Sequence, residues 1–310
     1  MVMPICYVDV DHLYSDLLNT ILSDGNDSRD RTGVGTRRMF GMSFTLDAGR
    51  KLLVPTFKPV NIKAVMAEFW CFTNGITNVD ELKRLGCNWW EANLQDANKR
   101  WGTPNNRDLG PVYGAQWVKP YICGAEVEGQ TYGDPHGYQV PVWTDQLTQL
   151  IKTIKENPVD RRMYVTAWNP EDFEAMALPP CYHGFQVFVH DGVLDLMWHM
   201  RSCDVILGLP HDILFHQFLM VALAAECGLK VGYMTVTLGD THIYNNALSA
   251  ADTFLARIQE DHHNGIKRAV PYLCDFLVGF RSISPEALEQ GLLFTGPYSP
   301  QPNIKVAMAV

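Results

Sequence analysis

The chain has 310 residues, of which 47% are hydrophobic and 19% are charged, so it has the composition of a globular protein with one large domain or two small ones. Its formal net charge of −9 argues against a general nucleic-acid binder, which needs a basic surface, although a few arginines can still hold one phosphate. The eight cysteines form no CxxC pair and no histidine cluster has zinc spacing, so we expect no metal.

The N-terminal stretch MVMPICYVDVDHLY lacks the basic start and the long apolar run of a signal peptide. No stretch approaches the length of a membrane span. We therefore expect a protein with reduced thiols and no membrane partner, in the cytoplasm of a cell or of a virus-infected host.

Helical and extended patterns follow one another in the first part of the chain. Residues 11–22 and 61–72 have apolar side chains at helical spacing, and the second range carries Glu68 as its single acid. Between these helices, RTGVGT (31–36) predicts a Gly-rich turn that leads into a strand over residues 38–46. Two polar ranges, 93–108 and 124–137, are rich in Asn, Pro or Gly and are expected to be surface loops or insertions.

The second half of the chain predicts helices mixed with strands. We expect an amphipathic helix over residues 143–157, a β-rich segment over 162–168, and a buried helix over 211–228 that ends at a glycine. Residues 184–190 and 193–201 alternate as strands and are joined by His-Asp-Gly, which predicts a hairpin. The fold class is therefore α/β or α+β, and no linker divides residues 1–310.

Cys181 lies in ALPPCYHGFQ, where two prolines fix the backbone that enters the cysteine. A buried structural thiol is one interpretation of this pattern. A nucleophile is the other, and it needs a nearby cation that favours the thiolate. Arg201 and the pair Arg161 and Arg162 are the candidates for that cation.

The segment RSCDVILGLPHDI (201–213) carries an Arg-Ser pair and two acids beside an apolar helix. Arg201 and Ser202 suit a phosphate, because a guanidinium offers a bidentate fork and the hydroxyl adds a further bond. For Asp212, the alternative to a functional role is that it caps the following helix.

The segment GDTHIYNN (239–246) places His242 and Tyr244 on one face of a strand. Both side chains can form hydrogen bonds with a sugar hydroxyl. A surface hairpin without a ligand is the other interpretation.

Taken together, the motifs resemble the thymidylate synthase family in type and in order over nearly the whole chain. The matching blocks are RTGVGT (31–36), LGPVYGAQW (109–117), DRRMYVTAWNP (160–170), LPPC (178–181), RSCDVILGLP (201–210), GDTHIYNN (239–246) and PNIKVAMAV (302–310). The resemblance implies a single domain over 1–310 with a large twisted mixed sheet flanked by helices. It also implies a homodimer, formed back to back through the sheets.

The resemblance implies a role for each matched residue, with a pyrimidine nucleoside monophosphate as substrate and 5,10-methylenetetrahydrofolate as co-substrate. Cys181 matches the nucleophile that adds to C6, Glu68 the acid that organises water and proton transfer, and Tyr113 the tyrosine of the proton-abstraction network.

The matched phosphate ligands are Arg31, Arg201 and Ser202, with Arg161 and Arg162 supplied to the partner's site. His242 and Tyr244 match the ligands of the sugar 3′-hydroxyl. The matched folate ligands are Lys58, Trp90 in NWWEAN, Asp204 and the C-terminal segment that ends at Val310.

The chain departs from the family at the residue that reads the base, where GLPHD places Asp212 instead of the Asn of GLPFN. Asn satisfies the N3–H donor and the O4 acceptor of uracil. An ionised Asp accepts from the N4 amino group of cytosine, and a protonated Asp also donates to N3. An ionised carboxylate would meet O4 of uracil without a proton between them, a mismatch of roughly 1–3 kcal/mol or more. Asp212, with Met200 before Arg201, is similar to the deoxycytidylate hydroxymethylases of phages.

Two products are compatible with these residues. Water added to the intermediate tethered to Cys181 gives 5-hydroxymethyl-dCMP, the product that we favour by resemblance, with Glu68 and Asp212 placed to order that water. Hydride transfer instead gives 5-methyl-dCMP, and Trp90 with the family-like C-terminus could exclude water as that route requires. CMP as substrate, dUMP as substrate and an inactive nucleotide-binding relative stay open, and Ser202 favours deoxyribose.

Overall fold

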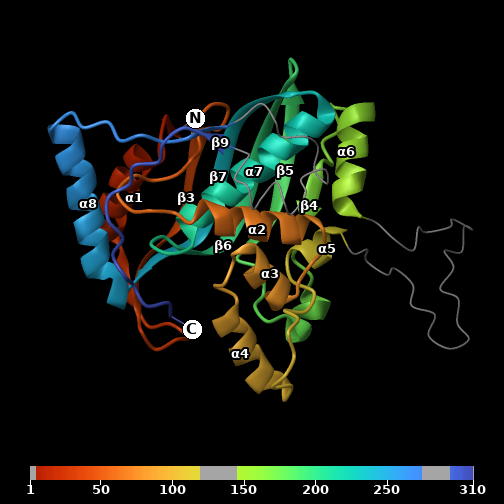
Figure 1. Ribbon diagram of the computed structural model, residues 1–310, viewed down its shortest axis with the longest axis horizontal. Helices are drawn as coiled ribbons and strands as arrows, with labels where there is room; N and C mark the ends of the chain where they lie inside the picture. Colours follow the sequence, from red (N-terminus) through yellow and green to blue (C-terminus); the bar gives the residue numbers. More distant parts are fainter. Residues whose placement is uncertain (1–4, 119–144, 274–293, 310) are drawn as a thin grey trace, which may run out of the picture.

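A mixed β-sheet forms the centre of the computed structural model, which describes residues 5–118, 145–273 and 294–309 (Figure 1). Within these ranges the sheet has seven strands in the order β1-β3-β7-β6-β5-β4, with β2 added on β3. The strands are β1 (Cys6–Tyr7), β2 (Asn26–Ser28), β3 (Thr36–Asp47), β4 (Tyr164–Thr166), β5 (Tyr182–His190), β6 (Val193–Asp204) and β7 (Lys230–Tyr244). The pairs β6–β7 and β1–β3 are parallel and the others antiparallel.

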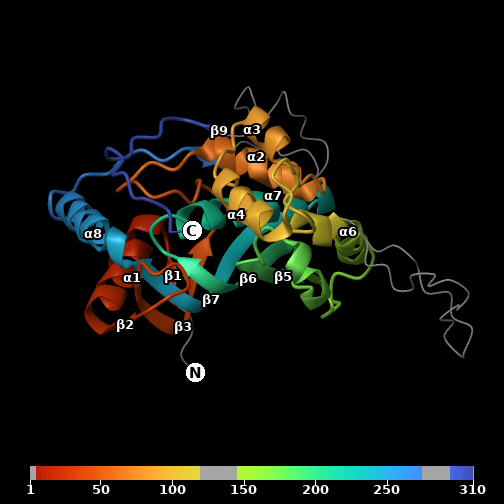
Figure 2. The ribbon, with the colours of Figure 1, turned by 90° about the horizontal axis from the view of Figure 1, so that it is seen from below.

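Helices cover one face of this sheet, with α7 against β6 and β7 and α2 against α7 (Figure 2). The helices are α1 (Val10–Asp24), α2 (Ile62–Thr73), α3 (Val79–Leu85), α4 (Glu91–Trp101), α5 (Gly114–Val118), α6 (Gln146–Glu156), α7 (Leu209–Cys227) and α8 (Leu248–His263). Two 3₁₀ helices, η1 (Pro170–Ala175) and η2 (Asn245–Ala247), and a small sheet of β8 (Tyr272–Leu273) with β9 (Phe294–Thr295) complete the described chain. The predicted α/β class is confirmed.

Helix α7 is the buried helix that the sequence predicts. It is apolar on all sides, and it ends at Gly228 in the left-handed conformation (φ 67°), which glycine adopts without strain. Its one fully buried amide, Gln217, is satisfied by the loop after β3: its Nε2 donates to the carbonyl oxygens of Ala48 and Lys51, and its Oε1 accepts from the N–H of Leu53. This pairing fixes the loop that leads to α2.

The hairpin between β5 and β6 is also confirmed. His190 pairs with Val193, and the two residues between them, Asp191 (φ 47°) and Gly192 (φ 73°), both have positive φ. This is the turn geometry that matches the twist of two antiparallel strands. The hairpin therefore aligns the first residues of β5 with the last residues of β6, where Cys181 and Arg201 lie.

The sheet face opposite α7 carries exposed aromatic side chains. Phe188 on β5 is 61% exposed and Tyr233 on β7 is 51% exposed, whereas Trp198 on β6, which points toward α7, is fully buried. None of the described helices covers this face of β5, β6 and β7 in Figure 2. Exposed aromatic residues on a sheet face are typical of a surface that another protein covers.

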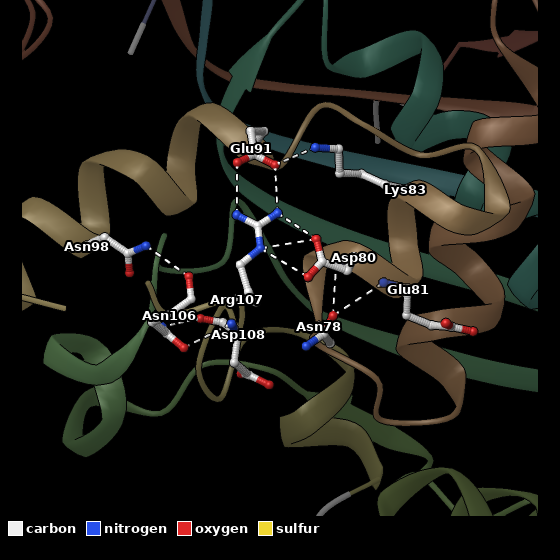
Figure 3. A network of polar contacts seen from close by, with 9 residues as sticks. All are labelled: Asn78, Asp80, Glu81, Lys83, Glu91, Asn98, Asn106, Arg107 and Asp108. Carbon is white, nitrogen blue, oxygen red and sulfur yellow. Dashed lines mark hydrogen bonds and ion pairs between the residues drawn. The ribbon is translucent and has the colours of Figure 1, made fainter. Parts of the chain in front are cut away.

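The prediction of a loop over residues 93–108 is wrong for its first part, because α4 extends to Trp101. The Asn-rich composition concealed a helix that buries Leu94 and Ala97. Figure 3 shows what holds this segment: the Arg107 guanidinium lies between the carboxylates of Asp80 on α3 and Glu91 on α4, with N–O distances of 2.7–3.1 Å. The other expected insertion, 124–137, lies outside the described residues.

Candidate active site

Cys181 directly precedes β5, and Arg201 on β6 is fixed beside it. The Nε of Arg201 donates to the carbonyl oxygen of Pro180 at 2.8 Å, and one of its terminal nitrogens donates to that of Pro179 at 2.8 Å. The N–H of Arg201 also donates to the carbonyl oxygen of Cys181 at 2.9 Å. The two prolines thus present carbonyl groups that orient the arginine, which places a cation next to a half-buried thiol.

Opposing effects set the pKa of Cys181. Burial raises it, the charge of Arg201 lowers it, the nearby carboxyl of Asp212 raises it, and a hydrogen bond from Tyr113 lowers it. Burial is the largest of these, so the pKa lies above its ordinary value. The free protein therefore holds Cys181 mainly as a thiol, and addition to a substrate requires that the thiol lose its proton.

Tyr113 connects Cys181 to the core. Its hydroxyl accepts a hydrogen bond from the N–H of Cys181 at 2.8 Å, and its ring stacks on Phe72 with 5.3 Å between ring centroids. Its backbone has φ 31°, a strained value for a residue other than glycine. Such strain is typical of functional sites, and here it aims the hydroxyl at the thiol.

Glu68 lies on α2, is 6% exposed and accepts two indole hydrogen bonds on one oxygen. Trp89 Nε1 donates to Oε1 at 2.8 Å and Trp90 Nε1 donates to the same Oε1 at 2.5 Å. Burial raises the pKa of Glu68 to about 7, against the opposing effect of the two indoles. At neutral pH this carboxyl can therefore both take up and release a proton.

Asp212 lies in the first turn of α7 and does not cap it. The capping position is Gly208, which has no side chain to bond the helix, so the interpretation of Asp212 as a helix cap is wrong. The carboxyl of Asp212 has no hydrogen-bond partner among the described residues. Burial raises its pKa well above the ordinary value, and the charges of Glu68 and Asp204 raise it further. The neutral form of this carboxyl is therefore favoured in the free protein, compared with an exposed aspartic acid.

Asp204 shapes the turn between β6 and α7. Its Oδ1 accepts from the N–H groups of Ile206 at 2.9 Å and Leu207 at 3.0 Å. Burial raises the pKa of Asp204, while these hydrogen bonds and the neighbouring Lys58 and His242 oppose the shift. One oxygen thus orders the turn, and the other has no partner within the described ranges and is free for a ligand.

His242 and Tyr244 lie on the last part of β7, and their rings meet edge to face at 5.0 Å. His242 Nδ1 lies 3.0 Å from an oxygen of Asp240, whose other oxygen accepts from Arg38 at 2.7 Å. This chain of contacts orients the imidazole. Asp204 pairs with His242 across β6 and β7, so the predicted sugar ligands lie beside the Arg201 end of β6.

The Gly-rich turn brings Arg31 to the same end of the sheet. Asp30 holds the turn by accepting from the N–H groups of Thr32 at 2.9 Å and Gly35 at 2.7 Å. Gly35 has φ 80°, a conformation that favours glycine, and a Cβ there would also lie 2.5 Å from the side chain of Asn245. Asn245 directly follows Tyr244, and its N–H donates to the carbonyl oxygen of Gly35 at 2.9 Å. Arg31 therefore lies beside the predicted nucleotide site.

Arg161 and Arg162 are not brought to Cys181 of the same chain. Both are exposed, Arg162 pairs with Asp160, and the carbonyl oxygen of Arg161 accepts from Gln186, the fifth residue after Cys181 on the β5 side. At the rise of a β-strand this places them roughly 15 Å from Cys181. The structure therefore does not bring these two arginines to the thiol of their own chain.

A cavity of about 770 Å³ lies next to the predicted nucleotide site. The segment that precedes α2, the turn before α7, helix α8 and the C-terminal segment line it, with the residues Lys58, Pro59, Val60, Asn61, Ile206, Leu207, His211, Phe254, Asn303, Ile304, Lys305, Val306 and Ala307. Its size and largely apolar wall fit a flat heteroaromatic ligand. Val310, which the sequence predicts to contact such a ligand, lies outside the described residues.

Lys58 and His211 are two of the polar residues that line this cavity. The amine of Lys58 donates to the carbonyl oxygen of Ile206 at 2.7 Å, and burial lowers its pKa to about 8. His211 bonds the carbonyl oxygen of Leu207 through Nδ1, and burial lowers its pKa to about 4, so it is neutral at pH 7. The indole of Trp89 meets His211 at 5.1 Å, whereas Trp90 is buried behind it. Trp89 is therefore a second tryptophan candidate beside Trp90, which the motif match did not single out.

A sequence model of the thymidylate synthase family matches residues 12–310 of the chain. The chain belongs to the thymidylate synthase family. Members transfer a one-carbon unit from methylenetetrahydrofolate to C5 of a pyrimidine nucleoside monophosphate and are typically dimers. The residues that the sequence predicts as nucleophile, phosphate ligands and sugar ligands lie at the ends of β5, β6 and β7, next to the cavity described above.

Two negative observations apply to the described parts of the chain. They contain no group of three or more His, Cys, Asp or Glu side chains arranged to hold a metal ion. No helix in them is both long enough and apolar enough to cross a membrane.

Proposed function

We propose that the protein transfers a one-carbon unit from 5,10-methylenetetrahydrofolate to C5 of a cytidine monophosphate, with dCMP as the favoured substrate and 5-hydroxymethyl-dCMP as the favoured product. The observation that carries the proposal is the half-buried carboxyl of Asp212, which has no partner in the described residues and lies close enough to Glu68 for the charge of Glu68 to raise its pKa. It occupies the position at which the family reads the base.

The raised pKa of Asp212, which favours the neutral carboxyl, supports cytosine as the base for a chemical reason. A neutral carboxyl donates one hydrogen bond and accepts another, so it can serve N3 and N4 of cytosine. It can also serve N3–H and O4 of uracil if the other oxygen carries the proton, so hydrogen-bond number alone does not discriminate. Cytosine N3 is basic, however, and can take the proton fully. A protonated ring accepts the Cys181 sulfur at C6 more readily, and uracil offers no comparable base.

The residues of the chain support the early steps as follows. Arg31, Arg201 and Ser202 hold the phosphate, and His242 with Tyr244 holds the sugar hydroxyl. This places C6 of the base over Cys181, with Asp212 at its N3 and N4 edge. Addition of the thiolate to C6 makes C5 nucleophilic, and bound methylenetetrahydrofolate supplies the one-carbon unit to it.

The favoured product is supported by the polar groups next to the base. Hydride transfer requires that water be excluded, whereas hydroxymethylation requires an ordered water and a base. Glu68 has a pKa of about 7 and an oxygen that no described residue bonds. Together with Asp212 it offers a polar wall where the exocyclic methylene would form. The methyltransferase remains the second candidate, because Trp89, Trp90 and the C-terminal segment can cover the site.

A homodimer is part of the proposal. The exposed aromatic face of the sheet and the distance of Arg161 and Arg162 from Cys181 support it together. Each copy would complete the other's phosphate site with these arginines, so activity would require the dimer.

Product analysis tests the proposal. We expect incubation with dCMP and methylenetetrahydrofolate to yield a nucleotide heavier by one CH₂O unit, without dihydrofolate. A product heavier by one CH₂ unit, with dihydrofolate, would identify the methyltransferase. Turnover of dUMP but not of dCMP would contradict the cytosine assignment, and CMP in the same panel tests the preference for deoxyribose.

A further inference from the structure

The hydroxyl of Tyr182 is a buried polar group that the mechanism above does not use. It has no hydrogen-bond partner among the described residues, although the side chain is 4% exposed. A buried hydroxyl without a partner is costly, so a protein retains one where a ligand or a water satisfies it. Tyr182 directly follows the proposed nucleophile Cys181, so a ligand or water at the active site is the natural partner for its hydroxyl.

The surroundings of Tyr182 place this hydroxyl at the base site. Its ring lies 4.3 Å from that of Tyr113, 5.5 Å from that of Phe215 and 4.8 Å from that of His216, with the last pair edge to face. The acid whose charge acts on it most strongly is Glu68. Tyr182 therefore faces the same small volume as Tyr113 and the acid on α2.

The same volume contains two oxygen acceptors that are free. Glu68 uses Oε1 for both indoles, and its Oε2 has no partner in the described residues. The carboxyl of Asp212 is likewise without one. A buried water is stable where two to four polar groups converge, and the charges of both carboxyls act on the Tyr182 hydroxyl.

Besides this hydroxyl, the side-chain polar atoms in the described ranges that are fully inaccessible to solvent and have no partner are the indole N–H groups of Trp117 and Trp198. An indole N–H only donates a hydrogen bond. It therefore cannot accept a hydrogen bond from a water whose other proton is donated to a base such as Glu68. A phenol hydroxyl both donates and accepts. Tyr182 is therefore the group suited to orient a reacting water.

We propose that the Tyr182 hydroxyl and Glu68 Oε2 hold the water that adds to the exocyclic methylene at C5. This assignment rests on the proposed hydroxymethylation. The water oxygen forms a bond to the methylene carbon, the electron pair of the exocyclic double bond moves to C5 and its conjugated ring, and one water proton passes to Glu68. Departure of the Cys181 sulfur from C6 then restores the C5–C6 double bond. No oxidant or reductant is needed.

The test is the fate of the methylene in Tyr182→Phe. Release of tritium from [5-³H]dCMP reports C5 proton loss, which precedes the addition of water, and should stay within about twofold of wild type. The yield of 5-hydroxymethyl-dCMP per tritium released should fall on the order of tenfold, because one hydrogen bond to the reacting water is lost. An added thiol should trap the accumulated methylene as a 5-thiomethyl adduct.

Tyr14→Phe is the matched control, because Tyr14 is equally buried but its hydroxyl donates to the carbonyl oxygen of Val205 at 2.9 Å. Tyr14→Phe should lower the Tm and leave the yield per tritium unchanged, whereas Tyr182→Phe should not lower the Tm. If tritium release and product fall together in Tyr182→Phe, or if neither changes, the assignment is wrong while hydroxymethylation by the wild type stands. A methyl product from the wild type would overturn both the assignment and the proposed function.

Discussion

Glu68 and Asp212 carry raised pKa values within one small volume, and this has consequences for stability as well as chemistry. A carboxyl whose pKa is higher in the folded than in the unfolded protein stabilises the fold at low pH, and this contribution disappears as the pH rises through the folded value. For Glu68 the two values are 4.5 and about 7. At neutral pH the buried Glu68 carboxyl therefore makes the folded protein less stable than it is at low pH.

This predicts a measurable loss of stability toward neutral pH. Between pH of about 4.5 and about 7, Glu68 should lower the free energy of unfolding by about 3 kcal/mol. Urea denaturation at fixed protein concentration should show this fall in wild type and a smaller fall in Glu68→Gln, which keeps an acceptor for both indoles. Glu156→Gln, at an exposed position on α6, is the control. An equal fall in wild type and Glu68→Gln would show that Glu68 does not titrate in this range.

At the scale of residues, the sequence predicted the site through local motifs and missed what depends on tertiary contacts. The structure places Cys181, Arg201, Tyr113 and Asp212 together, as the motifs implied. It also shows the Asp240 contact that orients His242, which required the pairing of β3 with β7 to become visible.

At the scale of elements, Arg107 links α3, α4 and the segment after α4 into one unit. It pairs with Asp80 and Glu91, and these hydrogen bonds hold the pKa of Glu91 at about 2. Glu91 directly follows Trp90. The ion pairs of Glu91 therefore also help to hold the indoles of Trp89 and Trp90 in place, where both donate hydrogen bonds to Glu68. Lys83 adds a further contact to Glu91 at 2.9 Å.

Arg107→Lys should loosen this unit although it keeps the charge. A lysine cannot form the two bidentate contacts that a guanidinium forms with the two carboxylates. We expect severalfold faster amide hydrogen exchange in α4 and altered fluorescence of the nearby tryptophans, with little change in α7. Arg50→Lys, at an exposed position, should change neither. Unchanged exchange in α4 would mean that apolar packing alone holds the helix.

The elements that the sequence predicted correctly have strong local patterns. Helix α7 is continuously apolar, and the β5–β6 hairpin carries a two-residue turn with glycine. Helix α4 was missed because its sequence is polar and rich in Asn, and because its ion-pair partner Arg107 follows the helix in sequence and also binds across to α3. The parallel pairing of β6 with β7 was likewise beyond local patterns, because α7 separates the two strands.

At the scale of the whole molecule, the proposed dimer predicts that two inactive variants restore activity in a mixture. Cys181→Ser lacks the nucleophile, and an Arg161→Ala, Arg162→Ala double variant lacks the donated arginines. In the heterodimer one site has both a cysteine and the partner's arginines. Half of randomly mixed dimers are heterodimers with one such site, so about a quarter of the wild-type activity should return after subunit exchange.

The control mixture combines Cys181→Ser with Arg201→Ala. Arg201 lies beside Cys181 of its own chain, so no heterodimer of this pair contains a complete site. Recovery in this control, or its absence in the first mixture, would contradict the assignment of Arg161 and Arg162 to the partner's phosphate.

The most direct test of the account is the ratio of kcat/KM for dCMP to that for dUMP in wild type and in Asp212→Asn. Asn can still form two hydrogen bonds with either base but cannot give N3 a proton. We predict that the variant loses kcat on dCMP by a factor on the order of 10² or more, with a smaller change in KM, and gains turnover of dUMP. A variant that keeps the wild-type ratio would show that Asp212 does not select the base.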